Sequence, residues 1–339
     1  MNLQELERIA HQMVADHRGL LAADESTGTI EKRFKAIGVV STAETHRSYR
    51  EMLFTTPGVE KFISGVIMYD ETIRQKTQTG VAFLDFLARL DILPGIKVDK
   101  GAKPLANSPA EKVTEGLDGL RERLQEYHKL GARFAKWRAV IDIGSEIPTE
   151  YCIRANAQAL ARYAALCQEA GLVPIVEPEV LMDGAHDIAR CAEVTSVTLK
   201  AVFDELYTHR IALEGMILKP NMVISGIRCP QQAGVEEVAR QTLRVLKRGV
   251  PAAVPGIMFL SGGQSAELAT AHLNAMNVLG LAPWELSFSY GRALQAPSLE
   301  AWKGRATNMA AGQNAFFHRA QCNSAACAGA YTDQMEKAA

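Results

Sequence analysis

The 339-residue sequence lacks an excess of charge of either sign, which limits its partners. Lysine and arginine together number 37 and aspartate and glutamate 38, so the formal net charge is −1. Proteins that bind nucleic acid or a membrane surface depend on a basic field or a polybasic run, and this sequence has neither. We therefore expect a small-molecule substrate, no nucleic acid and no membrane as partners.

The sequence also lacks the spacings that metal sites and disulfide frameworks need. Its six cysteines are far apart and form no C-x-x-C pair, and none of its eight histidines shows H-x-H or H-x-x-x-H spacing. We therefore expect no metal, no cofactor and no disulfide bonds. Unpaired cysteines are typical of a reducing compartment, which predicts a cytoplasmic location.

Long apolar runs are absent as well. No stretch approaches the roughly 20 apolar residues that a membrane-spanning helix needs. The first residues, MNLQELERIAHQMVADHRG, carry acidic residues and apolar residues at a spacing of three or four, whereas a secretion signal has an unbroken apolar core. We expect this segment to form an ordinary helix.

What the sequence does have is a series of eight short apolar segments, each followed by a helical pattern. Their lengths and flanking turn residues predict buried strands. They cover residues 19–24, 62–69, 95–100, 134–141, 173–179, 216–219, 256–263 and 285–292. Strands that alternate with helices pair in parallel, and eight of them close into an α/β fold of the (β/α)8 barrel type.

A doubly wound open sheet is the competing architecture, but it usually has a glycine-rich phosphate turn after its first strand, where this chain has D-E-S-T-G. We expect one barrel domain over residues 1–339, with extra terminal helices and a flexible tail over about residues 329–339. Between the strands we expect a loop at PLANSP, residues 104–109. We also expect a helix that begins at Ser41, with Glu44 at capping-box spacing, and one closing helix over about residues 298–327.

Charged residues lie at the carboxyl ends of five predicted strands. Residues two apart in a strand face the same side, and barrels carry their chemistry at this end. Buried charges cost free energy unless they are paired or used, so we expect these acids and bases to share one site that holds a charged substrate. They are Asp24, Lys97, Asp99, Lys136, Arg138, Glu177, Glu179 and Lys219.

Lys219 ends its apolar segment directly before Pro220, which places an amine at the end of a buried strand. Burial lowers the pKa of an ammonium and leaves a neutral amine that can attack a carbonyl. We expect Lys136 to lower it further, because two ammoniums about 6 Å apart at an effective dielectric constant of about 20 repel by about 3 kcal/mol. Glu177, on the strand between them, is expected to move protons. The alternative, a lysine whose head reaches solvent, stays open for any lone lysine.

The last two strands end in groups that suit a phosphate. Ser261, Gly262 and Gly263 lead into a helix and offer backbone N–H groups to an anion, and Gly291 and Arg292 add a close backbone approach and a bidentate cation. Barrels often bind phosphate after these strands. An S-G-G segment alone is more often a helix cap than a site, so the phosphate hypothesis depends on Arg292.

Together these segments resemble the class I fructose-bisphosphate aldolases over nearly the whole chain. The motifs are LLAADESTGTI, GIKVDKG, GLDGLRER, FAKWR, VPIVEPE, LKPNMV, FLSGGQS and FSYGRALQ, in that order. The resemblance implies a metal-independent lyase of glycolysis and gluconeogenesis. Such an enzyme cleaves fructose 1,6-bisphosphate to dihydroxyacetone phosphate and glyceraldehyde 3-phosphate through a lysine Schiff base. It also implies a homo-oligomer, commonly a tetramer.

The resemblance further implies a role for each residue in these motifs. Lys219 is the Schiff-base lysine, Glu177 the principal acid and base, and Asp24 a residue that assists carbon–carbon cleavage. Lys136 serves the intermediate and Glu179 supports the polar cluster. The residues implied to bind one phosphate are Ser261, Gly262, Gly263, Gly291 and Arg292, and those implied to contact the other end of the sugar are Arg33, Lys97 and Arg138.

One departure from the family leaves a step open. Many members end in a tyrosine that helps to exchange a proton on the enamine of dihydroxyacetone phosphate, whereas the last tyrosine here is Tyr331, in AGAYT. Two other functions also stay open: a transaldolase-type barrel that acts on a monophosphate, and a catalytically silent barrel that serves as a scaffold. Cationic groups for both ends of a bisphosphate disfavour the first, and charges at five strand ends disfavour the second.

Overall fold

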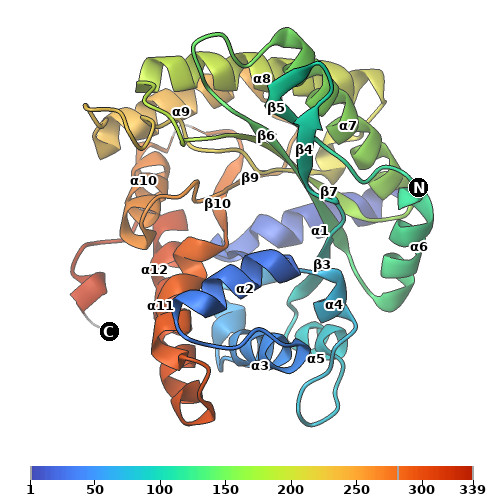
Figure 1. The fold of residues 1–339 in the computed structure, drawn as a ribbon, viewed down its shortest axis with the longest axis vertical. Coiled ribbons are helices and arrows are strands. Elements are labelled where there is room, and N and C mark those ends of the chain that lie inside the picture. The colour runs from blue at the N-terminus through green and yellow to red at the C-terminus, as the bar shows by residue number, and fades with distance from the viewer. Residues whose placement is uncertain (1, 281, 338–339) are drawn as a thin grey trace.

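The computed structural model describes residues 2–280 and 282–337, and its centre is a closed barrel of eight parallel strands (Figure 1). The strands follow one another around the barrel in the order β1-β10-β9-β8-β7-β6-β3-β2. Their bounds are β1 (Gly19–Ala23), β2 (Ile63–Met68), β3 (Leu93–Lys97), β6 (Phe134–Ile141), β7 (Val173–Val180), β8 (Ile217–Leu218), β9 (Gly256–Phe259) and β10 (Glu285–Tyr290). The predicted (β/α)8, or TIM, barrel is confirmed.

Helices surround the barrel, with α7 and α8 along one side and α2, α3 and α5 along the opposite side (Figure 1). The helices are α1 (Leu3–Val14), α2 (Thr27–Ala36), α3 (Ala43–Phe54), α4 (Asp70–Ile73), α5 (Phe83–Arg89), α6 (Leu120–Leu130), α7 (Glu150–Glu169), α8 (Ile188–Thr208), α9 (Val235–Gly249), α10 (Ala266–Leu279), α11 (Arg292–Trp302) and α12 (Met309–Cys327). In α9, for example, Val238, Thr242 and Val245 are buried at a spacing of three or four, which is the pattern of a helix that packs one face on a core.

Helix α1 closes the barrel at the end where the strands begin. Its Leu6, Ile9 and Met13 share one buried cluster with residues that point into the barrel, such as Phe134 and Ile217. Gly256, at the start of β9, leaves room for this helix: a Cβ atom there would lie 2.4 Å from the side chain of Val14. The helix predicted for the first residues is therefore present, and it leaves the carboxyl ends of the strands free to form a site.

The predicted loop at residues 104–109 is wrong, because this segment forms the tip of a hairpin. Strands β4 (Ala102–Leu105) and β5 (Ser108–Thr114) pair in antiparallel fashion, and Leu105 pairs with Ser108 across a two-residue turn. Asn107 adopts a positive φ of 60° in this turn, a conformation that asparagine tolerates. Prolines disfavour central strands, but a hairpin of two strands has only edges and accepts them.

The helix that was expected to begin at Ser41 begins one residue later. Thr42 is the N-cap: its hydroxyl accepts a hydrogen bond from the backbone N–H of Thr45 at 3.1 Å, and the Thr45 hydroxyl accepts one from Thr42 N at 2.9 Å. Glu44 instead forms an ion pair with Arg47 at 2.6 Å. The capping box is thus built from two threonines, and the prediction that used Ser41 and Glu44 is wrong.

The single closing helix expected over residues 298–327 is two helices, α11 and α12. Helix α11 ends where Lys303 and Gly304 take φ values of 50° and 70°, which a continuing helix cannot adopt. A short turn, Ala306–Asn308, then leads into α12. This break allows the two helices to pack on each other, as shown by Ser298 Oγ, which donates to Gly312 O at 2.7 Å.

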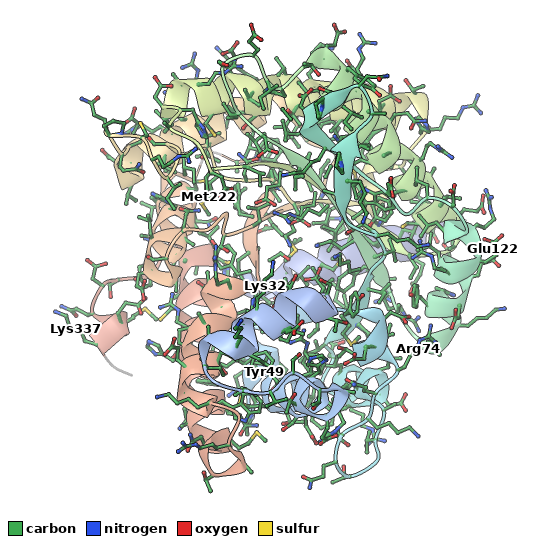
Figure 2. The ribbon with its side chains drawn as sticks, in the orientation of Figure 1. Lys32, Tyr49, Arg74, Glu122, Met222 and Lys337 are labelled. Atoms are coloured by element: carbon green, nitrogen blue, oxygen red, sulfur yellow. The ribbon has the colours of Figure 1, made fainter. Side chains whose placement is uncertain are left out.

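The last described residues pack on α12. Glu336, in the turn Met335–Lys337, pairs with Arg319 and accepts a hydrogen bond from the Tyr331 hydroxyl at 2.8 Å. Figure 2 shows Lys337 at the edge of the molecule. Residues 338 and 339 lie outside the described residues, so the flexible tail stays a prediction, as does the single-domain division. All six cysteines are free, and no described helix is both long and apolar enough to cross a membrane.

Candidate active site

A pocket of about 650 Å³ lies at the carboxyl ends of the barrel strands, and we call this opening the mouth. Every residue that the resemblance implied for the site lines it. These residues are Asp24, Arg33, Lys97, Lys136, Arg138, Glu177, Glu179, Lys219, Ser261, Gly262, Gly263, Gly291 and Arg292. Asp99, the remaining strand-end charge, pairs with Lys97 and is not among the lining residues. The expected convergence of strand-end charges is therefore what the structure has.

The barrel order places β7 between β6 and β8, so Glu177 lies between the two lysines in the way that the sequence suggested. In the register of β6 and β7, Arg138 pairs with Glu177. Lys219 directly follows the two residues of β8, and its backbone N–H donates to Val176 O at 2.8 Å. Pro220 comes next and has no N–H to continue the ladder. The end of β8 thus fixes the backbone of Lys219 against the centre of β7.

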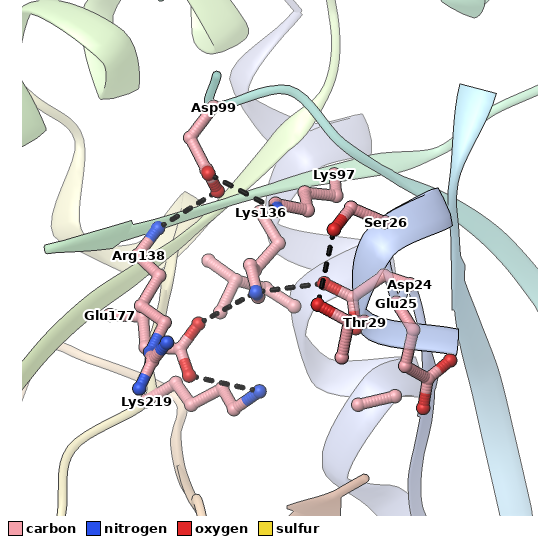
Figure 3. A network of polar contacts seen from close by, with 12 residues as sticks. Asp24, Glu25, Ser26, Thr29, Lys97, Asp99, Lys136, Arg138, Glu177 and Lys219 are labelled. Carbon is pink, nitrogen blue, oxygen red and sulfur yellow. Dashed lines mark hydrogen bonds and ion pairs between the residues drawn. The ribbon is translucent and has the colours of Figure 1, made fainter. Parts of the chain in front are cut away.

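Glu177 joins the two lysines into one buried cluster (Figure 3). One carboxylate oxygen lies 3.2 Å from Lys219 Nζ, and the other lies 3.1 Å from Lys136 Nζ without hydrogen-bond geometry. Lys136 Nζ also donates to Asp24 Oδ2 at 2.8 Å. The side chains of the lysines and Glu177 are at most 6% exposed. These charges are removed from water, so each one strongly affects the pKa of the others.

The environment moves the pKa values of the two lysines in opposite directions. Burial lowers the pKa of Lys219, and although Glu177 opposes this, the nearby charge of Lys136 adds to the lowering. Burial also acts to lower the pKa of Lys136, but Asp24, Glu177 and Asp99 outweigh it and raise that pKa. For Glu177 and Asp24, burial acts to raise the pKa, and the lysines outweigh it and lower it. The cluster therefore holds two carboxylates, one firmly charged ammonium and one amine that is easier to deprotonate.

The S-G-G segment after β9 is not the cap of the following helix, so the cap interpretation of its sequence does not apply. Ser265 caps α10, since its hydroxyl accepts from Leu268 N at 3.1 Å. Gly262 and Gly263 have φ values of 55° and 78°, and a Cβ atom on Gly263 would lie 3.2 Å from Arg292 Nη2. The glycines thus let the backbone turn beside a guanidinium, which is an arrangement that favours an anion.

The remaining cations line the pocket from three other elements. Lys97 at the end of β3 pairs with Asp99 at 3.4 Å, and Arg138 on β6 pairs with Glu179. Arg33, on α2, lies close to Gly291, since a Cβ atom on Gly291 would be 3.9 Å from Arg33 Nη2. Since Gly291 precedes Arg292, Arg33 lies nearer the S-G-G end of the pocket than its grouping with Lys97 and Arg138 implied.

Six polar residues that were not predicted from the sequence line the same pocket: Glu25, Ser26, Thr29, Lys32, Asp183 and Ser289. Ser26 and Thr29 stand at the start of α2, and their hydroxyls are 3.1 Å apart. Their position at the start of a helix that follows a barrel strand is the same sequence signal that S-G-G carries. The Ser289 hydroxyl is buried and has no partner among the described residues. It lies two residues before Gly291, so strand alternation could have found it.

The pocket contains no histidine or cysteine among the described residues that line it. In the described part of the chain, three residues have the spacing of metal ligands, and all lie on α12 or the terminal turn: His318, Cys322 and Glu336. Glu336 is already paired with Arg319 there. The buried carboxylates at the mouth are paired with lysines or arginines, so the groups that the pocket offers a substrate are an amine, carboxylates and cations.

A barrel whose mouth holds a buried amine beside a carboxylate, with cationic groups at two ends, defines an enzyme that acts on a charged carbonyl compound. Comparison with known proteins makes this class specific. A family model described as "Fructose-bisphosphate aldolase class-I" matches residues 5–339. The chain belongs to the class I fructose-bisphosphate aldolase family, as its resemblance to that family predicted.

Individual relatives agree over almost the full length of the chain. A "Probable fructose-bisphosphate aldolase class 1" from Xanthomonas campestris is 58% identical over 97% of this chain and 99% of its own. The "Fructose-bisphosphate aldolase" of Dictyostelium discoideum is 53% identical over 97% of this chain and 93% of its own. A crystal structure of the Plasmodium falciparum aldolase, in complex with TRAP and a small-molecule inhibitor, superposes with a TM-score of 0.96 at 49% identity, covering 97% and 95% of the two chains. The protein is therefore an aldehyde-lyase of this family.

Proposed function

We propose that this chain cleaves fructose 1,6-bisphosphate reversibly, through a Schiff base on Lys219, to dihydroxyacetone phosphate and glyceraldehyde 3-phosphate. Such a reaction belongs to glycolysis and gluconeogenesis. The observation that carries the proposal is the buried amine of Lys219, whose pKa is lowered and which lies 3.2 Å from the Glu177 carboxylate. A neutral amine is the form that attacks a ketone, and a neighbouring carboxylate can take and return the protons of that attack.

The chemistry proceeds in balanced steps. Lys219 Nζ attacks the ketone carbon C2, a proton passes to the carbinolamine oxygen, and water leaves to give a protonated imine. The C3–C4 bond then breaks and its electron pair moves into the imine, which becomes an enamine. Glu177, ionised because its pKa is lowered, takes the proton of the C4 hydroxyl as the aldehyde forms. Protonation of the enamine and hydrolysis of the imine release dihydroxyacetone phosphate.

Asp24 and Lys136 act as one unit in this scheme. Their side chains are hydrogen-bonded at 2.8 Å, and the raised pKa of Lys136 keeps it charged. A charged Lys136 stabilises the developing negative charge on substrate oxygens, and Asp24 holds it in place during cleavage. Glu179 has a supporting role, because it orients Arg138 at the mouth.

The two phosphates bind at opposite ends of the pocket in this proposal. One is held by the backbone of Ser261, Gly262 and Gly263 with Gly291 and Arg292, and the position of Arg33 beside Gly291 supports adding it to this group. The other is held by Lys97 and Arg138 together with the hydroxyls at the start of α2, Ser26 and Thr29. A pocket of about 650 Å³ lies within the usual range for a small-molecule site, about 300–1,000 Å³.

Trapping with borohydride tests the proposal directly. Borohydride reduces an imine, so incubation of the enzyme with fructose 1,6-bisphosphate and borohydride should inactivate it and leave a reduced adduct that peptide mapping assigns to Lys219. A parallel reaction with a chelator should retain full activity. Full turnover without any adduct would refute the mechanism. Comparison of fructose 1-phosphate with the bisphosphate then measures how far the second phosphate group contributes.

The remaining expectations concern assembly and location. We propose a cytoplasmic homo-oligomer, a tetramer by family resemblance. Two Arabidopsis thaliana relatives, 54% and 53% identical, are named as cytosolic aldolases. Tyr207 and Val197 on α8 are 59% and 47% exposed, which gives a helical face that a second subunit can cover. Light scattering coupled to gel filtration measures the subunit number.

A further inference from the structure

We infer that Glu25 is a positioning residue for the reaction: it holds the guanidinium of Arg33 at the S-G-G end of the pocket and acts on the substrate only through that arginine. The inference rests on the proposed function, since it assigns Glu25 a part in binding the phosphorylated substrate. Neither the sequence motifs nor the family comparison assigned a role to this carboxylate.

Glu25 and Asp24 are consecutive acids that point to opposite sides. Asp24 follows β1 and turns toward Lys136, while the Glu25 carboxylate is directed away from the lysine cluster (Figure 3). Consecutive residues in extended backbone alternate in direction, so one backbone segment supplies an acid to each of two sites. Asp24 is part of the lysine cluster at the reaction centre, whereas Glu25 binds Arg33 and Arg50.

Both oxygens of the Glu25 carboxylate accept hydrogen bonds, from the half-buried Arg33 and the buried Arg50 and Gln295. One oxygen accepts from Arg33 Nη1 and from Gln295 Nε2 at 2.8 Å, and the other accepts from Arg50 Nη2 at 2.6 Å. Arg50 is 2% exposed and Gln295 is 1% exposed. With both oxygens occupied, Glu25 offers no strong acceptor to the substrate, and its effect must pass through a partner. Of these three partners, Arg33 is the one that lines the pocket.

Gln295 and Tyr49 fix the carboxylate from two further elements. Gln295 Nε2 also donates to Ala22 O at 2.6 Å, and Tyr49 OH donates to Gln295 Oε1 at 3.0 Å. Tyr49 lies on α3 beside α2 (Figure 2), and its ring meets that of Phe34 at 5.6 Å between centroids. Strand β1 and helices α3 and α11 therefore hold Glu25 in one place, and a fixed acceptor allows Arg33 few orientations.

Glu25 orients Arg33 without neutralising its positive charge. One carboxylate is shared between two guanidinium groups, Arg33 and Arg50, so the trio carries one net positive charge. Arg33 uses Nη1 for Glu25, and among the described residues this is the only hydrogen bond that its guanidinium makes. Its Nη2 lies near Gly291. A pair of Arg33 and Glu25 alone would be neutral, whereas the shared carboxylate leaves Arg33 a cation that can bind phosphate.

The test compares Glu25→Gln with Glu51→Gln. Glu51 pairs with Arg47 on α3 away from the pocket, so its variant is the matched loss of an arginine–carboxylate pair. We expect Glu25→Gln to lower kcat/KM for fructose 1,6-bisphosphate by about 10-fold to 100-fold, mainly through KM, the size usual for a hydrogen bond to a charged group. Glu51→Gln should stay within about two-fold of the parent enzyme.

A double-mutant comparison separates positioning from a structural effect. Arg33→Ala and the double variant Glu25→Gln, Arg33→Ala should have the same kcat/KM within about two-fold, because Glu25 acts through Arg33. If Glu25→Gln lowers kcat/KM by the same factor in both backgrounds, the inference is wrong. If Glu25→Gln does not fold, Glu25→Asp retains the charge but withdraws the carboxylate from Arg33, and the same comparison applies.

Binding of inorganic phosphate separates this inference from the proposed function. Calorimetry on the intact enzyme should show phosphate binding that is weaker in Glu25→Gln and unchanged in Glu51→Gln. This measurement does not depend on turnover, so an enzyme that failed to cleave the sugar would still report on Arg33. Equal phosphate affinity in the parent and Glu25→Gln proteins would overturn the inference while leaving the Schiff-base mechanism untouched.

Discussion

Lys136 and Lys219 have the same side chain and the same degree of burial, and both touch Glu177, yet their pKa values move in opposite directions. Lys136 has Asp24 at 2.8 Å and Glu177 at 3.1 Å, and Asp99 adds a third negative charge. Lys219 forms an ion pair with Glu177 only, at 3.2 Å, and the charge of Lys136 acts on its pKa more strongly than that of Asp24. Burial penalises both ammoniums, so the number of nearby carboxylates decides which lysine keeps its proton.

The difference shows how one barrel can hold an acid and a nucleophile of the same residue type. The strand order places Glu177 beside both lysines, but Asp24, at the end of β1, is hydrogen-bonded to Lys136 and not to Lys219. The lysine with two partners stays an ammonium, and the lysine with one partner loses its proton more readily. Position on the barrel therefore assigns the two roles, and variants at these positions can test the assignment.

The largest expected effect follows from replacing the nucleophile. Lys219→Met should reduce cleavage to the level of a blank and abolish the borohydride adduct, because the pKa of Lys136, the other lysine beside Glu177, is raised and keeps that amine charged. Lys136→Met keeps the nucleophile, so the adduct should still form even though turnover falls. Mass spectrometry of tryptic peptides checks both. An adduct in the Lys219→Met protein would reverse the roles given to the two lysines.

The next effect concerns the carboxylate that both lysines share. Glu177→Gln should lower kcat by about 10²-fold to 10⁴-fold, the range usual for loss of a general acid or base. The adduct on Lys219 should still be trapped, more slowly. Steady-state kinetics with a coupled triose assay measures the loss. An unchanged kcat would mean that protons move through another group.

Removal of Lys136 and removal of Glu177 should shift the pKa of Lys219 in opposite directions. Lys136 lowers the pKa of Lys219 and Glu177 raises it. Lys136→Met should therefore move the pH midpoint of adduct formation upward, and Glu177→Gln should move it downward, each by about one unit or more. The rate of borohydride inactivation between pH 5 and pH 10 measures both. An unchanged midpoint in both variants would show that burial alone sets the pKa.

A smaller effect is expected on stability in acid. Burial acts to raise the pKa of Asp24, but the charges of Lys136 and Lys219 outweigh it. The pKa of Asp24 is therefore lowered in the folded protein. Such a group contributes stability above its unfolded pKa of about 3.9, and this stability is lost as the pH falls from there toward the folded value. Asp24→Asn should therefore lose stability at pH 7 and show a weaker further loss between pH 5 and pH 3. Urea unfolding at each pH measures this, with Asp204→Asn on the surface of α8 as the control.

Much of the fold and the site was predictable because it depends on short-range patterns. Eight apolar segments separated by helical periods specify a barrel, and charges at strand ends specify which residues meet at the mouth. Pro220 ends β8 and thereby marks Lys219. Gly304 is a signal for the break between α11 and α12. The apolar periodicity on both sides of it nevertheless continues the helical pattern, so the sequence predicted one helix.

What could not be predicted depends on partners that are distant in sequence. Glu25 faces Arg50, 25 residues away, and Gln295, 270 residues away. Nothing near Glu25 in the sequence indicates these contacts, so its neighbour Asp24 was chosen and Glu25 was not. The motifs grouped Arg33 with Lys97 and Arg138, and its position near Gly291 could not be predicted, because that distance depends on β1 and β10 being adjacent in the closed barrel.

The smallest effect on stability is expected for an ion pair that is as short as those of the site but is exposed to solvent. Lys200 and Asp204, on α8, are 2.6 Å apart with side chains 74% and 64% exposed. Lys200→Ala should cost at most about 0.5 kcal/mol in urea unfolding, whereas Lys136→Met, which leaves Asp24 and Glu177 buried with one cation fewer, should cost about 3–5 kcal/mol. The charges and distances are alike in the two pairs. If the two losses were equal, the mouth would be as well hydrated as the surface, and burial could not be what makes Lys219 a nucleophile.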